Sequence, residues 1–215
     1  MKFGARCHES LAQLNSTSHT CAVFTCCVHA MPILQQEPDL YPEDLLSSDA
    51  VAERDWYVIY TLSRREKDLM RRLRSLKISH YGPMVERRTK SPSGRVRTSY
   101  VPLFAGYLFV CGSEEDRYET VSTGCISQCI PVSDAVELVR DLRQIRVLEE
   151  HGADLQQELR PRVGQLARIV RGPLADRHLM GTISEVNSQH RLTIMVNFLQ
   201  QGASVVVDET DIELL

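Results

Sequence analysis

The chain has 215 residues, with 25 Lys and Arg against 28 Asp and Glu, and a formal net charge of −3. This length allows one large domain or two small ones, each with a core of its own. The composition is that of a globular protein, and no span is long and apolar enough to cross a membrane. Polar residues interrupt the apolar stretch near the N-terminus, which argues against a signal peptide. We therefore expect a cytoplasmic protein whose seven cysteines stay reduced.

Residues 1–53 have no sustained hydrophobic period and become acidic, with three prolines, towards their end. This pattern predicts a mostly disordered extension that is dispensable for folding. Its cysteines and histidines could instead bind zinc, but they lack the paired spacing of structural zinc sites, so we expect no metal. Met31 could be the true translation start. The residues that the zinc alternative would use are Cys7, His8, His19, Cys21, Cys26, Cys27 and His29.

Residues 54–149 are predicted to form a first domain that begins with a strand and a helix. The aromatic and β-branched residues of 56–61 predict the strand. Ser63 and Glu66 have the spacing of a capping box and so predict that a helix starts there. The helix would turn one face to the core and a basic face outward. The expected inward residues are Leu69, Met70, Leu73 and Leu76, and the outward ones are Arg64, Lys67, Arg71 and Arg74.

The rest of the first domain is predicted to follow the order β-β-α-β-α. We expect strands at 78–90, 101–111 and 125–132, a turn at 91–94, and a helix at 113–123. A last helix, capped by Ser133 or Asp134, is expected to run to about 149. The complete order is typical of a ferredoxin-like α/β domain in which helices cover one side of a sheet. Residues 64–97 hold twelve basic and three acidic residues, and this local charge favours contact with nucleic acid.

Residues 150–162 are polar and predict a linker. After it, short β-rich runs at 163–170, 179–186, 192–198 and 204–207 alternate with turns, one of them at Gly172-Pro173. A tail at 211–215 could close the sheet. This spacing predicts a small β-barrel of the SH3-like kind as the second domain, at 163–215. The overall fold class is therefore α+β.

The two domains resemble the NGN and KOW domains of NusG-type transcription elongation factors. The strand at 56–60 and the run at 102–110 look like the signature strands of the NGN domain, and 163–181 look like the core of the KOW module. Within this family the residues are closest to the specialised paralogue RfaH. Three departures stand out: Ala105 replaces a usual proline, the loop at 177–180 is longer, and the helix around 114–120 lacks RfaH's threonine motif.

The resemblance implies an elongation or antitermination factor that binds the clamp helices of RNA polymerase through an aromatic-lined cavity. It further implies contact with upstream or non-template DNA, and recruitment of Rho or a ribosomal small-subunit protein by the KOW domain. We expect a monomer without cofactors. The residues expected to bind polymerase are Trp56, Tyr60, Phe104, Tyr107 and Phe109. Those expected to bind DNA are Arg64, Lys67, Arg71, Arg74, Arg95 and Arg97, and those expected to bind the KOW partner are Arg171, Gly172, Pro173 and Leu174.

Simpler interpretations stay open at this point. The aromatic residues could be ordinary core, and the basic helix face could be a solvated surface. A different function would be that of a KOW-containing RNA-binding or ribosome-associated protein. The second domain argues against RNA binding, because residues 163–215 hold four arginines, no lysine and six acidic residues. No glycine-rich phosphate loop or nucleophile motif is present, so we do not expect an enzyme.

Overall fold

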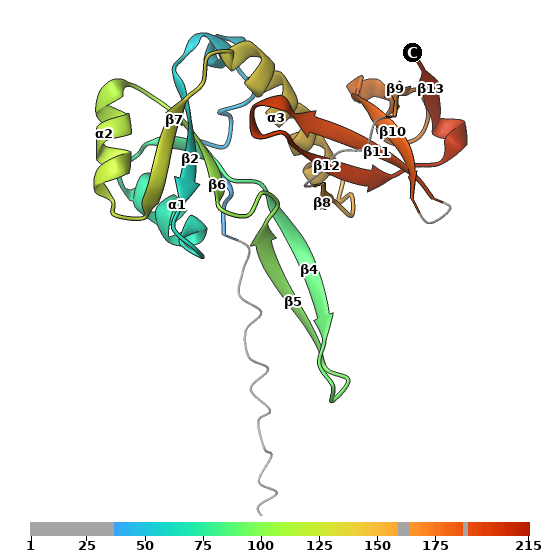
Figure 1. The fold of residues 1–215 in the computed structure, drawn as a ribbon, viewed down its shortest axis with the longest axis horizontal. Coiled ribbons are helices and arrows are strands. Elements are labelled where there is room, and N and C mark those ends of the chain that lie inside the picture. The colour runs from blue at the N-terminus through green and yellow to red at the C-terminus, as the bar shows by residue number, and fades with distance from the viewer. Residues whose placement is uncertain (1–36, 159–163, 187–188) are drawn as a thin grey trace, which may run out of the picture. The chain divides into compact units, whose positions relative to one another are not determined.

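The computed structural model describes residues 37–158, 164–186 and 189–215 (Figure 1). All of them belong to one compact unit. Their strands form a five-stranded sheet, a two-stranded ribbon and a six-stranded sheet, and three α-helices accompany the first sheet. The architecture is therefore mixed α and β. In these ranges, no helix has the length and apolarity needed to span a membrane.

The five-stranded sheet is antiparallel throughout and has the order β1-β3-β6-β2-β7. Its central strand β2 is paired on both sides and is apolar over most of its length, as expected for a strand covered on both faces. The strands are β1 (Leu40–Tyr41), β2 (Trp56–Thr61), β3 (Ser79–Tyr81), β6 (Tyr107–Cys111) and β7 (Ile126–Pro131). The helices are α1 (Glu66–Ser75), α2 (Glu114–Ser122) and α3 (Ala135–Glu150).

Helices lie against both faces of this sheet, so the expectation of one covered side is wrong. Successive residues of a strand point to opposite faces. On β2, Tyr57 and Ile59 pack with the buried residues of α1, whereas Trp56 and Val58 pack with those of α3. The Tyr57 hydroxyl also donates a hydrogen bond to Glu114 of α2 at 3.4 Å. Helices α1 and α2 therefore lie on one face and α3 on the other.

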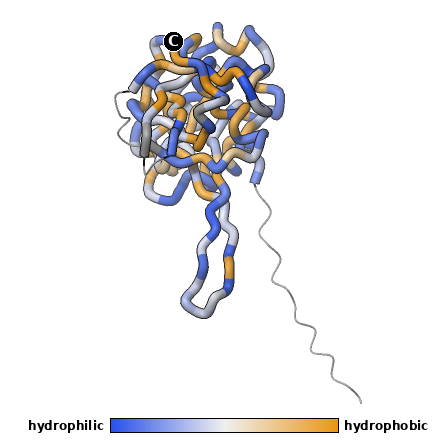
Figure 2. Tube along the Cα trace, turned by 90° about the vertical axis from the view of Figure 1, so that its right-hand side faces the viewer, coloured by the Kyte–Doolittle hydropathy of each residue, from blue (hydrophilic) through white to orange (hydrophobic). Residues whose placement is uncertain are grey.

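The two long predicted strands at 78–90 and 101–111 are each broken. Residues 78–90 divide into β3 and β4 (Met84–Lys90), with Gly82 and Pro83 between them. Residues 96–111 divide into β5 (Val96–Pro102) and β6. Strands β4 and β5 pair only with each other and form the ribbon, closed by the predicted turn at 91–94. Figure 2 shows that this ribbon projects from the body of the fold and is largely hydrophilic.

The predicted capping box at Ser63 is absent. Helix α1 starts at Glu66 after Arg65, because Arg64 has a positive φ of 61° and ends the preceding turn. The side chain of Glu66 instead accepts a hydrogen bond from the Gly106 amide at 2.9 Å. Three of the four predicted inward residues of α1 are buried, but Leu76 is 45% exposed. Helices α2 and α3 begin as predicted, behind side-chain caps from Ser113 and Asp134.

The prediction of a disordered extension up to residue 53 is wrong for residues 37–53. This segment contains β1 and the short helix η1 (Asp49–Glu53), and β1 pairs with β3 at the edge of the sheet. Four of its apolar side chains are at most 6% exposed and belong to the core on the α3 side. Those four residues are Leu40, Leu45, Leu46 and Val51. The cysteines and histidines of the zinc alternative lie outside the described residues.

The six-stranded sheet is antiparallel and has the order β13-β9-β10-β11-β12-β8. Strand β8 pairs with β12, so part of the predicted linker is a strand. The order starts at β13 and ends at β8, and closure into a barrel stays a prediction. The strands are β8 (Gln156–Glu158), β9 (Gln165–Ile169), β10 (Met180–Val186), β11 (Gln189–Val196), β12 (Gln201–Val206) and β13 (Ile212–Leu214). Short helices lie at η2 (Ala175–Arg177), η3 (Asn197–Leu199) and η4 (Glu209–Asp211).

The buried His80 of β3 makes stability depend on pH. Its Nδ1–H donates to the carbonyl of Ile78 at 2.9 Å, the side chain is fully buried, and burial lowers its pKa to about 4. Since an unfolded histidine titrates near ~6.5, the unfolded chain binds a proton first as the pH falls. We expect up to about 3 kcal/mol of stability, present above pH ~6.5, to be lost between there and pH ~4. Glu149, whose pKa is raised to about 8, has the opposite effect in this range, so the test is the difference between two proteins. Denaturant unfolding should show that, as the pH falls from ~6.5 to ~4, the unaltered chain loses up to about 3 kcal/mol relative to His80→Gln. An equal pH dependence in both proteins would contradict the assignment.

Candidate functional site

The five aromatic residues predicted to bind polymerase lie on one face of the first sheet, but three of them are buried. Trp56 and Phe104 are 1% exposed, and Phe109 is 0% exposed. The indole N–H of Trp56 donates to a backbone carbonyl at 2.9 Å, as a buried indole requires. These three side chains pack in the core next to α3. Only Tyr60 and Tyr107, which are direct partners across β2 and β6, reach the surface.

Phe104 reaches this face because the chain breaks between β5 and β6. A regular strand would place Phe104 and Phe109 on opposite faces, since they are five residues apart. The chain bends at Ala105-Gly106, where Gly106 has a positive φ of 82°. The two phenyl rings meet edge to face, with centroids 6.3 Å apart. A Cβ on Gly106 would lie 3.0 Å from the Tyr60 ring, so glycine also makes room for that ring.

An aromatic surface remains where α3 does not cover this face. The rings of Tyr60 and Tyr107 lie 5.1 Å apart at a tilt of 46°. Ile130 of β7 pairs with Val58, and so it points to the same face. Tyr60 is 41% exposed and Ile130 is 37% exposed. We call Tyr60, Tyr107 and Ile130 the aromatic surface; it can accept apolar side chains from a partner helix.

The basic face of α1 is partly occupied by the segment before β1. Arg71 donates two hydrogen bonds to the carboxylate of Glu37, at 3.0 and 2.5 Å, and these bonds lower the pKa of Glu37. Arg74 donates to the carbonyl of Pro38 at 2.5 Å. Arg64 is exposed but lies outside the helix, and Lys67 is half-buried. The four predicted DNA-binding residues therefore do not form one free face.

The ribbon carries a second basic face, which has no acidic residue. Residues that pair across an antiparallel ribbon share a face. The register places Arg87 opposite Ser99 and Arg97 opposite Thr89, and the backbone bond from Ser91 to Arg95 continues the same face. We call Arg87, Arg95 and Arg97 the basic ribbon face. All three are exposed, and none has an ion pair within the described ranges.

The opposite face of the ribbon has a different charge pattern. Arg88 forms an ion pair with Glu86 at 2.5 Å, and Lys90 lies two residues further along the same strand. The sequence analysis counted Arg87 in the basic segment 64–97 but listed only Arg95 and Arg97 of the basic ribbon face among the expected DNA-binding residues. The alternation of charged and hydroxyl residues in 87–99 is the signal that could have located it, once the strand pairing was known.

The predicted KOW partner site is a turn held by the C-terminal segment. Arg171, Gly172 and Pro173 are exposed, and Leu174 is partly buried against the core. Gly172 has a positive φ of 80°, and the amides of residues 170 and 171 donate to the Asp211 carbonyl at 2.8 and 3.2 Å. The turn is thus fixed by the backbone and leaves three of the four residues accessible.

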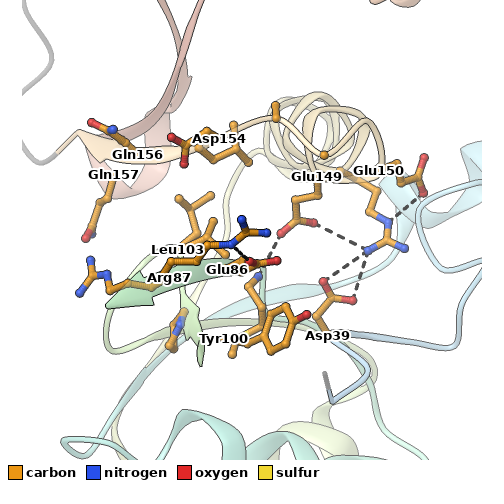
Figure 3. A pocket seen from close by; sticks show the side chains of 18 residues that line it. Asp39, Glu86, Arg87, Tyr100, Leu103, Glu149, Glu150, Asp154, Gln156 and Gln157 are labelled. Atoms are coloured by element: carbon orange, nitrogen blue, oxygen red, sulfur yellow. Dashed lines mark hydrogen bonds and ion pairs between the residues drawn. The ribbon is translucent and has the colours of Figure 1, made fainter. Parts of the chain in front are cut away.

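A buried carboxylate connects α3 with the base of the ribbon (Figure 3). Glu149 accepts hydrogen bonds from the Tyr81 hydroxyl at 2.6 Å and from the Met84 amide at 3.0 Å. Arg146 lies 3.7 Å from Glu149 and also contacts Asp39 at 3.2 Å. Burial, and then the nearby Asp39 carboxylate, raise the pKa of Glu149 to about 8. In the ranges that the structure describes, no group of His, Cys, Asp and Glu side chains is arranged to hold a metal ion.

Comparison with known proteins gives a family match for part of the chain. A search of curated proteins gave no match. Residues 54–148 match the model of a protein family described as transcription termination factor nusG. The match begins just before β2 and ends near the end of α3, and so it contains the aromatic surface and the basic ribbon face. Residues 54–148 are therefore similar to the domain that this family of transcription termination factors shares.

Proposed function

We propose that this protein is a transcription elongation and antitermination factor that binds RNA polymerase through its NusG-type domain. The observation that carries the proposal is the family match over residues 54–148, which encloses the aromatic surface. In this proposal the domain bridges the DNA channel of polymerase and suppresses pausing or termination. The closeness to RfaH and the KOW assignment of residues 163–215 belong to the same proposal.

The aromatic surface is the proposed contact for the polymerase clamp helices. Tyr60 and Tyr107 are rigid side chains with both apolar and polar contact atoms, a combination that is frequent at interface hot spots. Trp56, Phe104 and Phe109 would act beneath them as supports, since their rings are almost fully buried. A partner helix could therefore dock on the two tyrosines while the buried rings keep the sheet surface in place.

Tyr60→Ala is expected to weaken binding to an RNA polymerase elongation complex by about 2 kcal/mol, or roughly thirtyfold. The side chain is 41% exposed, so the change in thermal stability should be small. Tyr118→Ala is the matched control, because Tyr118 is 71% exposed but lies on α2. A fluorescence-detected titration of the elongation complex measures the affinities of the unaltered chain and of both variants. Equal affinities for Tyr60→Ala and the unaltered chain would reject the proposed contact.

The basic ribbon face is the proposed contact for upstream or non-template DNA. Arginines two residues apart on one strand face are spaced by about 7 Å, which allows contacts with successive phosphates. Such contacts give sequence-neutral binding that weakens as salt increases. Helix α1 would contribute less, because two of its arginines already contact residues 37 and 38.

Arg95→Glu combined with Arg97→Glu should weaken the binding of DNA and make the salt dependence shallower by about 0.9 for each phosphate that the protein no longer neutralises. Arg88→Glu combined with Lys90→Glu is the matched control, since it reverses two charges on the other ribbon face. Titration of a DNA fork substrate at several salt concentrations gives both slopes. If the slope decreases equally in both double variants, the ribbon attracts DNA only through its total charge.

The six-stranded sheet is the proposed site for recruitment of Rho or a ribosomal small-subunit protein. The accessible turn at 171–173 supports a protein contact there. We further propose that the protein acts as a cytoplasmic monomer without enzymatic activity. Pull-down of purified Rho and of small ribosomal subunits by the full chain would distinguish the two partners. If the Arg171→Glu variant no longer captures that partner, the result would support the turn at 171–173 as the partner's binding site.

A further inference from the structure

A groove of about 1090 Å³ lies beside the ribbon, at the C-terminal end of α3 (Figure 3). One wall consists of the consecutive residues 84–88 of β4, and another of residues 152–157, which lead into β8. Both faces of β4 contribute to the lining, whereas β5 contributes only residues of one face. The groove therefore runs along the edge of β4 that is not paired with β5. Its volume is slightly above the range of about 300–1,000 Å³ that is usual for small-ligand sites.

The backbone of β4 presents hydrogen-bonding groups to this groove at every second residue. In an antiparallel pair, the N–H and C=O of one residue both point towards the partner strand, and those of the next residue both point away from it. The Pro83 carbonyl accepts from Leu103, and the Ser91 amide donates to Arg95, so odd-numbered residues face β5. The Met84 amide, by contrast, donates to Glu149 on the outer side. It follows that the N–H and C=O of residues 86 and 88 point outward.

The opposite wall of the groove also contains the edge strand of a sheet. Strand β8 is the last strand in the order of the six-stranded sheet and pairs on one side with β12. Gln156 and Gln157, which are adjacent in sequence, both line the groove. A strand edge that is not paired is a template for the addition of another strand. The groove thus lies between the edges of two different sheets.

Charge in the groove favours a cationic occupant. The lining contains five acidic residues and three arginines. Arg146 is shared among Asp39, Glu149 and Glu150, and Arg88 is paired with Glu86. Asp154 is exposed and has no ion pair within the described ranges. The third arginine of the lining, Arg87, lies on the ribbon. Even without Glu149, whose pKa is raised to about 8, the end of the groove next to α3 has the carboxylates of Asp39, Glu150 and Asp154 beside the single guanidinium of Arg146.

We propose that this groove binds an extended segment of a partner protein as an added strand along β4, with a Lys or Arg side chain placed among the carboxylates at the end of α3. The backbone groups of residues 86 and 88 supply the main-chain hydrogen bonds, in the manner of β-augmentation. The edge from Met84 to Arg88 spans about 13 Å at ~3.3 Å per residue, which fits a strand of about five residues. Asp154 and Glu150 select for positive charge. The site is separate from the aromatic surface, and its test does not depend on polymerase binding.

Two substitutions at one position test the backbone contact. Arg88→Pro removes the outward N–H of residue 88, whereas Arg88→Ala removes the same side chain and keeps that N–H. The bonds between β4 and β5 use odd-numbered residues, so the ribbon should survive proline at this edge position. Thermal unfolding and the circular dichroism of both variants establish that the fold is intact.

The probe is a library of random peptides that is selected for binding to the full chain. Each peptide has about seven residues, which are the five that the strand edge can pair with and one flanking residue on each side. Enriched peptides should contain Lys or Arg and lack proline, and they should bind Arg88→Pro at least tenfold more weakly than Arg88→Ala. Asp154→Asn should weaken them several-fold, and Lys→Glu in the peptide should abolish binding. Failure to enrich any peptide, or equal affinity for the two variants at position 88, would overturn the proposal. Displacement of the selected peptides by a DNA oligonucleotide, with no difference between the two variants, would assign the groove to nucleic acid instead.

Discussion

A chain that begins at Ala52 will fail to fold stably, whereas a chain that begins at Ile33 will keep the stability of the full-length protein. The shorter chain lacks four apolar side chains that are at most 6% exposed. Each buried side chain of this size contributes about 1.5–3 kcal/mol, so their loss is comparable with the ~5–15 kcal/mol that stabilises a whole domain. It also lacks most of η1, including Val51, whose carbonyl accepts the indole N–H of Trp56.

Thermal and urea-induced unfolding of the two truncated chains measures this difference directly. Leu46→Ala in the full chain offers a milder form of the same test and should cost about 2–5 kcal/mol. The neighbouring Ser47 is exposed, so Ser47→Ala is the control and should leave stability almost unchanged. A melting temperature within a few degrees of the full chain for the protein that starts at Ala52 would show that residues 37–51 are dispensable.

Phe109→Ala is expected to lower the free energy of unfolding by about 3–5 kcal/mol, as the truncation of a fully buried phenylalanine does. The ring is 0% exposed, lies at the centre of the face between β2 and β3, and meets Phe104 edge to face. Its removal leaves a cavity under α3 that the sheet cannot close without moving its neighbours. The effect is therefore on stability first, and on partner binding only through the smaller amount of folded protein.

Tyr60→Ala is the comparison that distinguishes a residue that contacts polymerase from a buried residue that supports the contact surface. It lies on the same face, but its ring is partly in solvent, so the predicted loss is in polymerase affinity. Urea unfolding and polymerase binding should both be measured for the two variants. If Phe109→Ala kept its stability and lost polymerase affinity, Phe109 would be a contact residue and the buried packing of this ring would be wrong.

The sequence predicted the elements whose signals are local. Strand β2 was located by its aromatic and β-branched residues, and α2 by the acidic run at 113–123. Helix α3 was located by a cap at Ser133 or Asp134, of which the structure has Asp134. The breaks within 78–90 and 101–111 were harder to predict from the sequence, because the segments on both sides of each break contain residues that favour strands. Pro83 and Gly106 were the available signals: proline cannot donate a ladder hydrogen bond, and glycine adopts a positive φ.

The remaining misassignments come from tertiary contacts. The apolar residues of 37–53 follow no helical or strand period, so their burial depends on the surface that the sheet and α3 provide. Glu66 had the spacing of a capping residue but binds the Gly106 amide instead. At the site, the five aromatic residues predicted to bind polymerase lie on one face of the sheet, but the rings of Phe104 and Phe109 are buried and do not line a surface cavity. Which of them reach solvent was set by α3, and sequence alone does not show that helix's position.

The edge strand β1 has a consequence for solubility. An open sheet edge invites other chains to add strands, and proteins reduce this risk with very short edge strands and flanking prolines. Strand β1 has two residues and lies between Pro38 and Pro42, and it pairs with β3, which would otherwise be the edge. Protein that loses this segment should therefore aggregate through β3 rather than persist as soluble, partly folded monomer. Light scattering during the unfolding of the two truncated chains would distinguish these outcomes.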